Sequence, residues 1–279
     1  MADIYVDMTL ASGLNDGTSW TDAYQGEVGL NTALTAANLS PGDSVYVKNR
    51  ATSATGAPTY SAPSGVDNPV RVYGCQSGTT NEPPTASDLI PGYRTGASTP
   101  ATDNTLPGFV SGQNATVDIY GHFYFYGLEI TSGNDLEINY ASAYGKVTFE
   151  ECKIGWGRNA GGDKTLSIGY GTLQNQLIPY FHAKNCVLSP SKTGEDTQLR
   201  GNSARIILER CSVDRTVTTL FKMDGGKGGG VIKCDGCDFS SITTVFASTF
   251  NCAHELQLSN CLLGASTTIH PSTDRPFRV

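Results

Sequence analysis

The stretch VTFEECKI at residues 147–154 carries a pattern that recurs along the chain. Apolar side chains at its first and third positions alternate with polar ones, a bend residue stands fifth, and a small apolar anchor stands sixth. The frame returns at residues 123–130, 181–188, 206–213, 232–239 and 256–263, and more weakly around Val45 and Val70. Alternation with a period of two is typical of a half-buried strand, so each copy predicts a strand, a bend and a second strand.

The anchor positions are almost evenly spaced. They hold Arg50, Cys75, Leu128, Cys152, Cys186, Cys211, Cys237 and Cys261. Successive anchors lie 24–26 residues apart, except for a gap of 53, interpreted as two periods with one degenerate coil, and a gap of 34, interpreted as one period with an insertion. A repeat of about 25 residues lies in the range of solenoid proteins and predicts an all-β, single-domain right-handed parallel β-helix of about eight or nine coils.

The residue before each anchor supports the same fold. These positions hold Asn49, Gly74, Gly127, Glu151, Asn185, Arg210, Gly236 and Asn260, and six of the eight are Gly or Asn. Gly and Asn tolerate the left-handed backbone that a one-residue corner between two strands requires. Stacked coils would therefore place the anchor cysteines in an interior column, where cysteine acts as a small buried hydrophobe.

The frame also predicts which side chains are buried. The interior set is Val147, Phe149, Phe181, Ile206, Leu208, Cys211, Ile232, Leu256 and Leu258. Their outward neighbours, expected to be at least partly exposed, are Thr148, His182, Ile207, Lys233 and Gln257.

The regions outside the repeat divide the chain further. Residues 1–44 are expected to form an N-terminal strand and a short capping helix near 28–39, and residues 45–263 the β-helix. Apolar residues at helical spacing indicate the helix. Two stretches, 76–108 and 155–165, break the period and are expected to be surface excursions. The C-terminal tail, 264–279, shows no repeat pattern, so it could cap the last coil or reach a neighbouring chain.

Composition and charge restrict the choice of function. The chain has 279 residues, of which 16% are charged, and a net charge of −7, which is unfavourable for binding nucleic acid. The sequence opens with no secretory signal, and no apolar run approaches the roughly 20 residues that a membrane span needs. We therefore expect a protein that folds in the cytoplasm, has no membrane partner and keeps its eight cysteines reduced.

Four stretches near the N-terminus carry a resemblance to a known superfamily. They are DIYVD (3–7), NDGTSW (15–20), PGDSVYV (41–47) and NPVRVYG (68–74). Together they resemble the opening of pectin-lyase-like right-handed parallel β-helix proteins. That superfamily includes lyases, hydrolases, phage tailspikes and non-catalytic virion proteins. This compact chain looks most like the phage members that decorate capsids, although a shared fold does not by itself determine function.

The resemblance implies a structural protein of a bacteriophage virion. We expect a capsid decoration, or cement, protein on the outer capsid surface, synthesised in the host cytoplasm. Its expected partners are the major capsid protein and further copies of itself, most simply as a homotrimer. The alternative is a tail spike or tail fibre protein that binds or degrades a glycan. A cellular β-helix lyase is a third hypothesis, which the absence of a signal segment disfavours.

Enzymes of this fold that cleave sugar polymers need clustered outward carboxylates. One outward column, two positions before the anchor, holds Tyr126, Glu150, Lys184, Glu209, Asp235 and Ser259. A second, one position after it, holds Glu129, Lys153, Val187, Ser212, Asp238 and Leu262. The best catalytic candidate is Glu209 with Asp235, near Arg210 and Arg215. We interpret this group as a solvated face of mixed charge, and expect no catalytic residue and no enzymatic activity.

A metal site is the alternative interpretation of the cysteines. Cys234, Cys237, Cys252 and His254 supply four possible zinc ligands. Cys234 and Cys237 fall on inward repeat positions, however, and a single residue separates the second pair. We therefore interpret them as buried thiols and expect no metal and no cofactor.

The aromatic run at residues 123–126 is a candidate sugar-stacking platform. Alternation would bury Phe123 and Phe125 and leave only Tyr124 and Tyr126 outside, so this candidate is weak.

Overall fold

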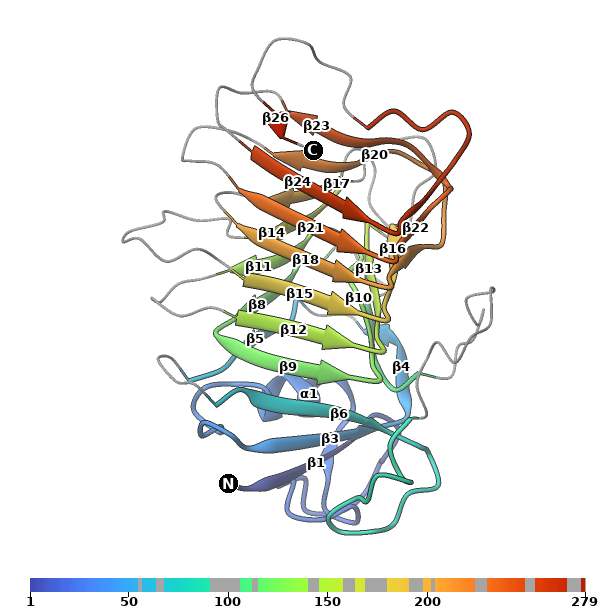
Figure 1. Cartoon of the computed structure of the whole chain (residues 1–279). Coiled ribbons are helices and arrows are strands. Elements are labelled where there is room, and N and C mark those ends of the chain that lie inside the picture. Colours follow the sequence, from blue (N-terminus) through green and yellow to red (C-terminus); the bar gives the residue numbers. More distant parts are fainter. Residues whose placement is uncertain are drawn as a thin grey trace.

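Three parallel β-sheets form the body of the protein (Figure 1). The computed structural model describes residues 1–54, 57–63, 68–90, 106–111, 115–139, 146–157, 164–168, 180–190, 198–201, 204–223, 230–248, 254–269 and 277–278. In this part of the chain one helix, α1 (Gly26–Ala33), accompanies twenty-six strands, all paired in parallel. The expectation of an all-β protein with parallel sheets is confirmed.

The largest sheet, sheet A, has eleven strands. In spatial order they are β2 (Tyr24–Gln25), β1 (Asp3–Asp7), β3 (Ser44–Lys48), β6 (Val70–Cys75), β9 (His122–Tyr126), β12 (Lys146–Glu150), β15 (Tyr180–Lys184), β18 (Arg205–Glu209), β21 (Val231–Asp235), β24 (His254–Ser259) and β26 (Phe277–Arg278). In Figure 1 the colours of these strands run from blue to red along the stack, because each strand pairs with its counterpart in the next repeat.

Two further sheets complete the body. Sheet B contains β4 (Arg50–Ala54), β7 (Gly108–Ser111), β10 (Glu129–Thr131), β13 (Lys153–Trp156), β16 (Val187–Pro190), β19 (Ser212–Val213), β22 (Asp238–Phe239) and β25 (Leu262–Leu263). Sheet C contains β5 (Thr59–Ser61), β8 (Val117–Tyr120), β11 (Leu136–Asn139), β14 (Thr165–Ile168), β17 (Gln198–Gly201), β20 (Val217–Met223) and β23 (Ile242–Ser248).

The chain visits the three sheets in a fixed order. From β3 onward it runs through A, B and C and returns to A, so β12, β13 and β14 form one such passage. We call each passage a rung. Each of the seven strands of sheet C completes a rung, and β1 precedes the first of them. Every rung hydrogen-bonds to the rungs on either side of it, which satisfies backbone groups that would otherwise lie open at sheet edges.

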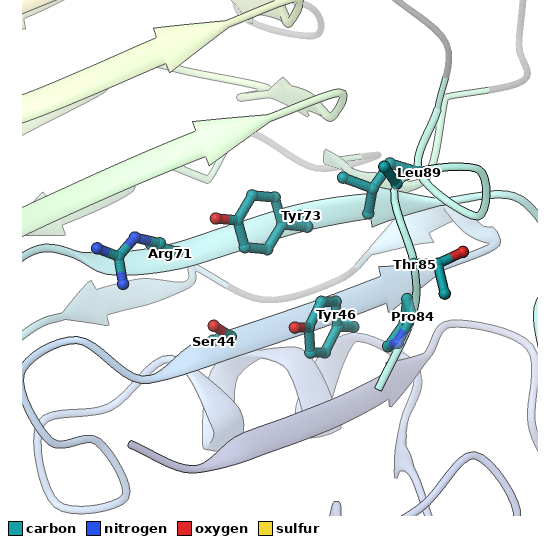
Figure 2. A pocket seen from close by; sticks show the side chains of 8 residues that line it. Ser44, Tyr46, Arg71, Tyr73, Pro84, Thr85 and Leu89 are labelled. Atoms are coloured by element: carbon teal, nitrogen blue, oxygen red, sulfur yellow. The ribbon is translucent and has the colours of Figure 1, made fainter. Parts of the chain in front are cut away.

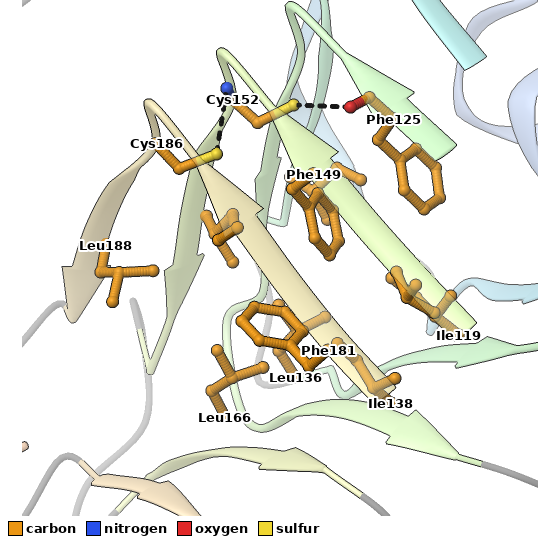
Figure 3. Packing of buried hydrophobic residues seen from close by; sticks show 14 of the residues in the cluster. Ile119, Phe125, Leu136, Ile138, Phe149, Cys152, Leu166, Phe181, Cys186 and Leu188 are labelled. Atoms are coloured by element: carbon orange, nitrogen blue, oxygen red, sulfur yellow. Dashed lines mark hydrogen bonds between the residues drawn. The ribbon is translucent and has the colours of Figure 1, made fainter. Parts of the chain in front are cut away.

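The predicted interior positions form the core. Val147, Phe149, Phe181, Ile206, Leu208, Cys211, Ile232 and Leu256 are all fully buried, and their predicted outward neighbours are partly or fully exposed. Leu258 alone of the interior set is only half-buried, since it lies on the last rung that contributes to both sheets A and B. Equivalent side chains lie above one another: Phe125 and Phe149, which pair in register, stack with ring centroids 4.9 Å apart (Figure 3).

The one-residue corner between sheets A and B is confirmed at seven of the eight predicted positions. Asn49, Gly127, Glu151, Asn185, Arg210, Gly236 and Asn260 all have φ between 49° and 64°. For Glu151 and Arg210 this backbone costs about 1–2 kcal/mol each. Side-chain hydrogen bonds along the corner column help to offset that cost: Asn185 Nδ2 donates to Glu151 Oε1 (2.6 Å), and Arg210 Nε donates to Asn185 Oδ1 (2.7 Å).

The first two anchors depart from the predicted frame. Arg50 pairs with Gly108, which pairs with Glu129, so it stands in the outward column and not in the anchor column. Its guanidinium lies 3.0 Å from the Glu129 carboxylate. Cys75 ends β6, which continues straight through Gly74, and it is buried in a separate cluster outside the main core. The anchor position requires an apolar side chain that points into the core just after a corner. Arg50 is charged, and Cys75 follows no corner, so neither residue is an anchor.

The interpretation of the 53-residue gap as two periods is also wrong. The gap does not contain a degenerate coil, because β6, β7 and β8 belong to one rung. The additional length is the excursion between β6 and β7. Its first described part, 76–90, folds back on the strand: Leu89 bridges to Cys75, and Ile90 N donates to Gly74 O. The predicted boundary at 108 is close, since β7 begins at Gly108.

The second excursion is shorter than predicted. Gly155 and Trp156 belong to β13 and Thr165 to β14, and residues 158–163 lie outside the described part. The side chain of Trp156 is fully buried in the core, and the strand that carries it therefore continues past residue 155.

The two ends of the chain both add to the stack. Helix α1 starts earlier and ends earlier than predicted, at Gly26 and Ala33, and places Leu30 and Ala33 in the main core next to β1 and β4. At the other end the tail takes the first of the two alternatives that the sequence left open, because it packs on the last coil. β26 pairs with β24, and Thr268 pairs with Thr244 of sheet C, so the tail adds to the last rung.

Candidate functional site

A column of four tyrosines stands on the outer face of sheet A. Tyr5, Tyr46, Tyr73 and Tyr126 occupy one register position on β1, β3, β6 and β9. We call this column the tyrosine ladder. Ring centroids are 5.8 Å apart for Tyr5–Tyr46, 5.7 Å for Tyr46–Tyr73 and 6.4 Å for Tyr73–Tyr126. Parallel pairing without a register shift brings these rings together, because in-register neighbours on adjacent strands lie about 5 Å apart.

A pocket of about 360 Å³ opens beside the ladder. Figure 2 shows Tyr46 and Tyr73 at its centre, Arg71 and Ser44 at one end, and Pro84 and Leu89 at the other. Its volume is near the lower limit of about 300–1,000 Å³ for ligand pockets.

The wall of the pocket is the first described part of the excursion, residues 76–90. Trp20 fixes this segment: its Nε1 donates to Asn81 O (3.0 Å), and its backbone N–H donates to the Glu82 carboxylate. The Asp88 carboxylate then accepts hydrogen bonds from Asn81 Nδ2 (2.8 Å) and Thr85 Oγ1 (2.6 Å). The wall is thus attached to the body by Trp20 at one end and by the bridge from Leu89 to Cys75 at the other.

The pocket combines neutral phenols with the Arg71 cation and, beside Tyr46, the carboxylate of Asp3. Burial and the charge of Asp3 raise the pKa of Tyr46, burial raises the pKa of Tyr73, and burial with the charge of Asp3 raises the pKa of Tyr5 to about 12. These groups stay protonated at neutral pH and can donate hydrogen bonds. Arg71 donates from Nη1 to Gly42 O (3.3 Å), and within the described residues no carboxylate lies within 4.0 Å of its guanidinium.

From β9 to β15, the outer face of sheet A carries a second hydrogen-bonded group, Tyr124, Glu150 and Lys184. Tyr124 Oη donates to Glu150 Oε2 (2.9 Å), and Lys184 Nζ lies 2.5 Å from Glu150 Oε1. Burial alone would raise the pKa of Glu150, but the hydrogen bonds from Lys184 and Tyr124 outweigh it and lower the pKa. Glu150 is therefore an ionised carboxylate with two donors, which is unsuited to act as a general acid.

The structure places Glu209 and Asp235 directly side by side, as the repeat predicted. Their carboxyl groups nevertheless turn to opposite neighbours. Glu209 Oε1 lies 3.3 Å from His182 Nε2 on the preceding rung, while Asp235 Oδ1 accepts a hydrogen bond from Asn260 Nδ2 (3.1 Å) on the following rung. Arg210 is held by Asn185, as described above. The predicted group is thus adjacent in the sheet but does not converge on one point.

The candidate zinc ligands lie only partly within the described residues. Cys234 and Cys237 are inward and buried, as predicted. Cys252 lies outside the described residues, and His254 is described only as the first residue of β24. Among the described residues no group of three or more His, Cys, Asp or Glu side chains could hold a metal ion.

The sequence located part of the aromatic surface. Phe123 and Phe125 are buried while Tyr124 and Tyr126 lie half-buried outside, as alternation predicted. The lower part of the ladder was missed. Its signal is present in the sequence as a tyrosine between two apolar residues in IYV (4–6) and VYV (45–47), and again in VYG (72–74). Only the observed register shows that these tyrosines form one column.

No family model, no curated protein and no solved structure matches the chain. In the described part of the chain, no helix is long and apolar enough to span a membrane.

Proposed function

We propose that the chain is a right-handed parallel β-helix that serves as a non-catalytic structural protein of a phage virion, bound to the outer surface of the capsid as a decoration protein. The observation that carries this proposal is the unbroken pairing of the eleven strands of sheet A. At about 4.8 Å per strand, they span about 50 Å. Such a stack is stiff, because every rung is fixed to its neighbours.

The outward carboxylates support a non-catalytic role. Hydrolysis of a glycan needs two carboxyl groups that face one bond from opposite sides. Glu209 and Asp235 turn away from each other, and Glu150 is neutralised by Lys184. Glu209 and Asp235, the best catalytic candidate in the sequence, and Glu150 are therefore engaged in contacts that stabilise the stack.

The proposed partners are the major capsid protein and further copies of the chain, most simply three. Identical chains usually assemble with closed rotational symmetry, and a capsid offers threefold positions to match it. The net charge of −7 disfavours a nucleic acid partner.

The location can be tested on particles of the phage that encodes the chain. Purified virions would be labelled with a gold-conjugated antibody against the protein and imaged in negative stain. We expect label over the whole capsid surface. Label restricted to tails, or absence of the protein from washed capsids, would refute the decoration hypothesis.

The tyrosine pocket favours a second candidate, a tail protein that binds or degrades a glycan, because aromatic side chains beside an arginine suit an acidic sugar. This candidate predicts depolymerisation of host capsular polysaccharide, lost in Glu209→Gln. We expect no cleavage of pectate, alginate or capsular polysaccharide. Cleavage that depends on Glu209 would replace the decoration hypothesis with this one.

A further inference from the structure

We propose that the pocket beside the tyrosine ladder binds an extended, proline-containing segment of a partner protein that carries a carboxylate. The inference rests on the proposed role as a structural virion protein and specifies the chemistry of its partner contact.

The chain already docks a proline-containing segment on this surface. Residues 81–86 (NEPPTA) lie next to Trp20, whose indole N–H donates to the backbone carbonyl of Asn81 (3.0 Å). Pro84 of that segment lines the pocket together with Tyr46 and Tyr73. An indole donor that holds a carbonyl, with proline beside tyrosine, is the chemistry by which aromatic grooves recognise proline-rich peptides. The pocket is the continuation of this docking surface.

The segment already docked on this surface favours a peptide over a sugar. Neighbouring rings of the ladder are nearly parallel, with interplanar angles of 28° for Tyr5–Tyr46 and 21° for Tyr46–Tyr73, and Figure 2 shows the rings of Tyr46 and Tyr73 side by side at the centre of the pocket. Aromatic-lined grooves receive proline-containing segments. The phenol of Tyr73 can donate a hydrogen bond to a carbonyl oxygen. A polyproline II backbone exposes its carbonyls because it has no internal hydrogen bonds.

The two ends of the pocket select further features of the occupant. Pro84 and Leu89 form an apolar end that can receive a proline ring. Arg71 forms a cationic end. Its guanidinium has five N–H donors, and the structure describes one hydrogen bond from it, to Gly42 O. A carboxylate is the group that a guanidinium binds best, through paired hydrogen bonds. An acidic side chain or a C-terminal carboxylate near a proline would satisfy both ends.

The test uses the full chain and defined peptides. A fluorescein-labelled (Pro-Pro-Glu)3 peptide would be titrated by fluorescence anisotropy, with (Ala-Ala-Glu)3 and (Pro-Pro-Lys)3 as comparison peptides and a labelled oligogalacturonate as the glycan. We expect (Pro-Pro-Glu)3 to bind at least about tenfold more tightly than the other three, which corresponds to about 1.4 kcal/mol.

Four variants locate the site. Tyr73→Ala should weaken (Pro-Pro-Glu)3 binding about tenfold, and Arg71→Gln should abolish the preference for Glu over Lys. Tyr180→Ala and Arg205→Gln, which change the same face of sheet A three and four rungs above the pocket, should leave binding unchanged. A thermal melt of each variant shows that it is folded. The milder Tyr73→Phe, which removes only the hydroxyl, should still weaken binding if Tyr73→Ala does not fold.

The inference is overturned if (Ala-Ala-Glu)3 binds as well as (Pro-Pro-Glu)3, or if Tyr180→Ala weakens binding as much as Tyr73→Ala. It is also overturned if the oligogalacturonate binds in a Tyr73-dependent way and the peptides do not. Its failure is distinguishable from failure of the proposed function. Capsids labelled by antibody with no peptide binding refute the pocket inference alone, whereas peptide binding with unlabelled capsids refutes the decoration hypothesis alone.

Discussion

Cys211 Sγ donates a hydrogen bond to the backbone carbonyl of Ala183, 3.3 Å away on the preceding rung. The same contact recurs along the anchor column, with Cys152 bound to Phe125 O, Cys237 to Leu208 O and Cys261 to Cys234 O. The carbonyl concerned lies three residues before the anchor of the lower rung in every case. The anchor thiol thus joins consecutive rungs just after the chain has turned its corner, which gives a physical reason for cysteine in a buried apolar column.

Replacing one rung-to-rung thiol should therefore weaken the stack. Cys211→Ala removes a buried sulfur and its hydrogen bond, so we expect the free energy of unfolding to fall by about 1–2 kcal/mol. Cys261→Ala is the matched control, since Cys261 makes the same contact on the last rung but is only half-buried. Its cost should be less than half as large. Equal costs in urea unfolding would show that burial in the column does not matter.

The thiols should be inert in the folded protein. Burial raises the pKa of Cys186, Cys211 and Cys234 well above the ordinary range, and that of Cys75 to about 12. Since the thiolate is the reactive form, a thiol reagent at pH 8 should label these residues only after unfolding. We expect eight reactive thiols in the denatured, unreduced protein and no zinc by elemental analysis. Fewer than eight thiols would reveal a disulfide, and stoichiometric zinc would restore the metal hypothesis.

The repeat predicted the middle of the molecule well and its beginning poorly. From Phe123 to Cys261 each rung places its apolar residues, its corner and its anchor in one order, so a single frame gives register and burial. Before residue 76 the frame fails because the outer face of sheet A is also covered there. Tyr5, Trp20, Tyr46 and Cys75 form a second buried cluster, which puts apolar residues on both sides of the strands. Where both faces of a strand are buried, apolar and polar residues do not alternate along it, so the sequence does not show which side chains point into the core.

The candidate site could be predicted only in part for a related reason. Tyr124 and Tyr126 belong to the regular frame, so their outward position followed from alternation. Tyr46 and Tyr73 line the pocket because Arg71 pairs with Ser44, two residues out of the predicted alignment, and because the excursion folds back over them. A register shift and a loop path are set by tertiary contacts such as that of Trp20 with Asn81, which no local pattern encodes.

The core should be sensitive to truncation on its inward side only. Leu208→Ala removes a fully buried side chain between rungs that cannot collapse around the gap, so we expect a loss of about 2–5 kcal/mol. Ile207→Ala, its outward and partly exposed neighbour, should cost about 1 kcal/mol or less. Chemical unfolding followed by far-UV circular dichroism would measure both. A Leu208→Ala protein as stable as the parent would contradict the stacked core.

His182 should make stability depend on pH below neutrality. Burial lowers its pKa from the ordinary 6.5, opposed by the nearby Glu209 and assisted by Lys146 and Lys184. Below pH 6.5 the unfolded chain therefore binds a proton that the folded chain resists, and stability falls as the pH falls, by at most about 1.4 kcal/mol per pH unit. His182→Gln should reduce this slope between pH 6.5 and 5. Glu209→Gln should steepen it, because it removes the charge that favours the protonated ring. The same slope in all three proteins would refute the assignment.

Removing the tail should expose the end of the stack. Residues 264–279 supply the partner of Thr244 in sheet C and of β24 in sheet A, so a chain that ends at Leu263 leaves both edges open. The seven complete rungs do not include the tail, and we expect the truncated protein to keep its β-rich circular dichroism spectrum. Open, unpaired strand edges pair with other chains, so the truncated protein should melt at a lower temperature and self-associate with rising concentration, as measured by light scattering after gel filtration.

Thr267→Val is the matched control, because it keeps the tail and removes only the hydrogen bond from Thr267 Oγ1 to Ile242 O (2.8 Å). It should melt slightly earlier than the parent without self-associating. A truncated protein that neither self-associates nor melts earlier would show that the tail does not protect the last rung.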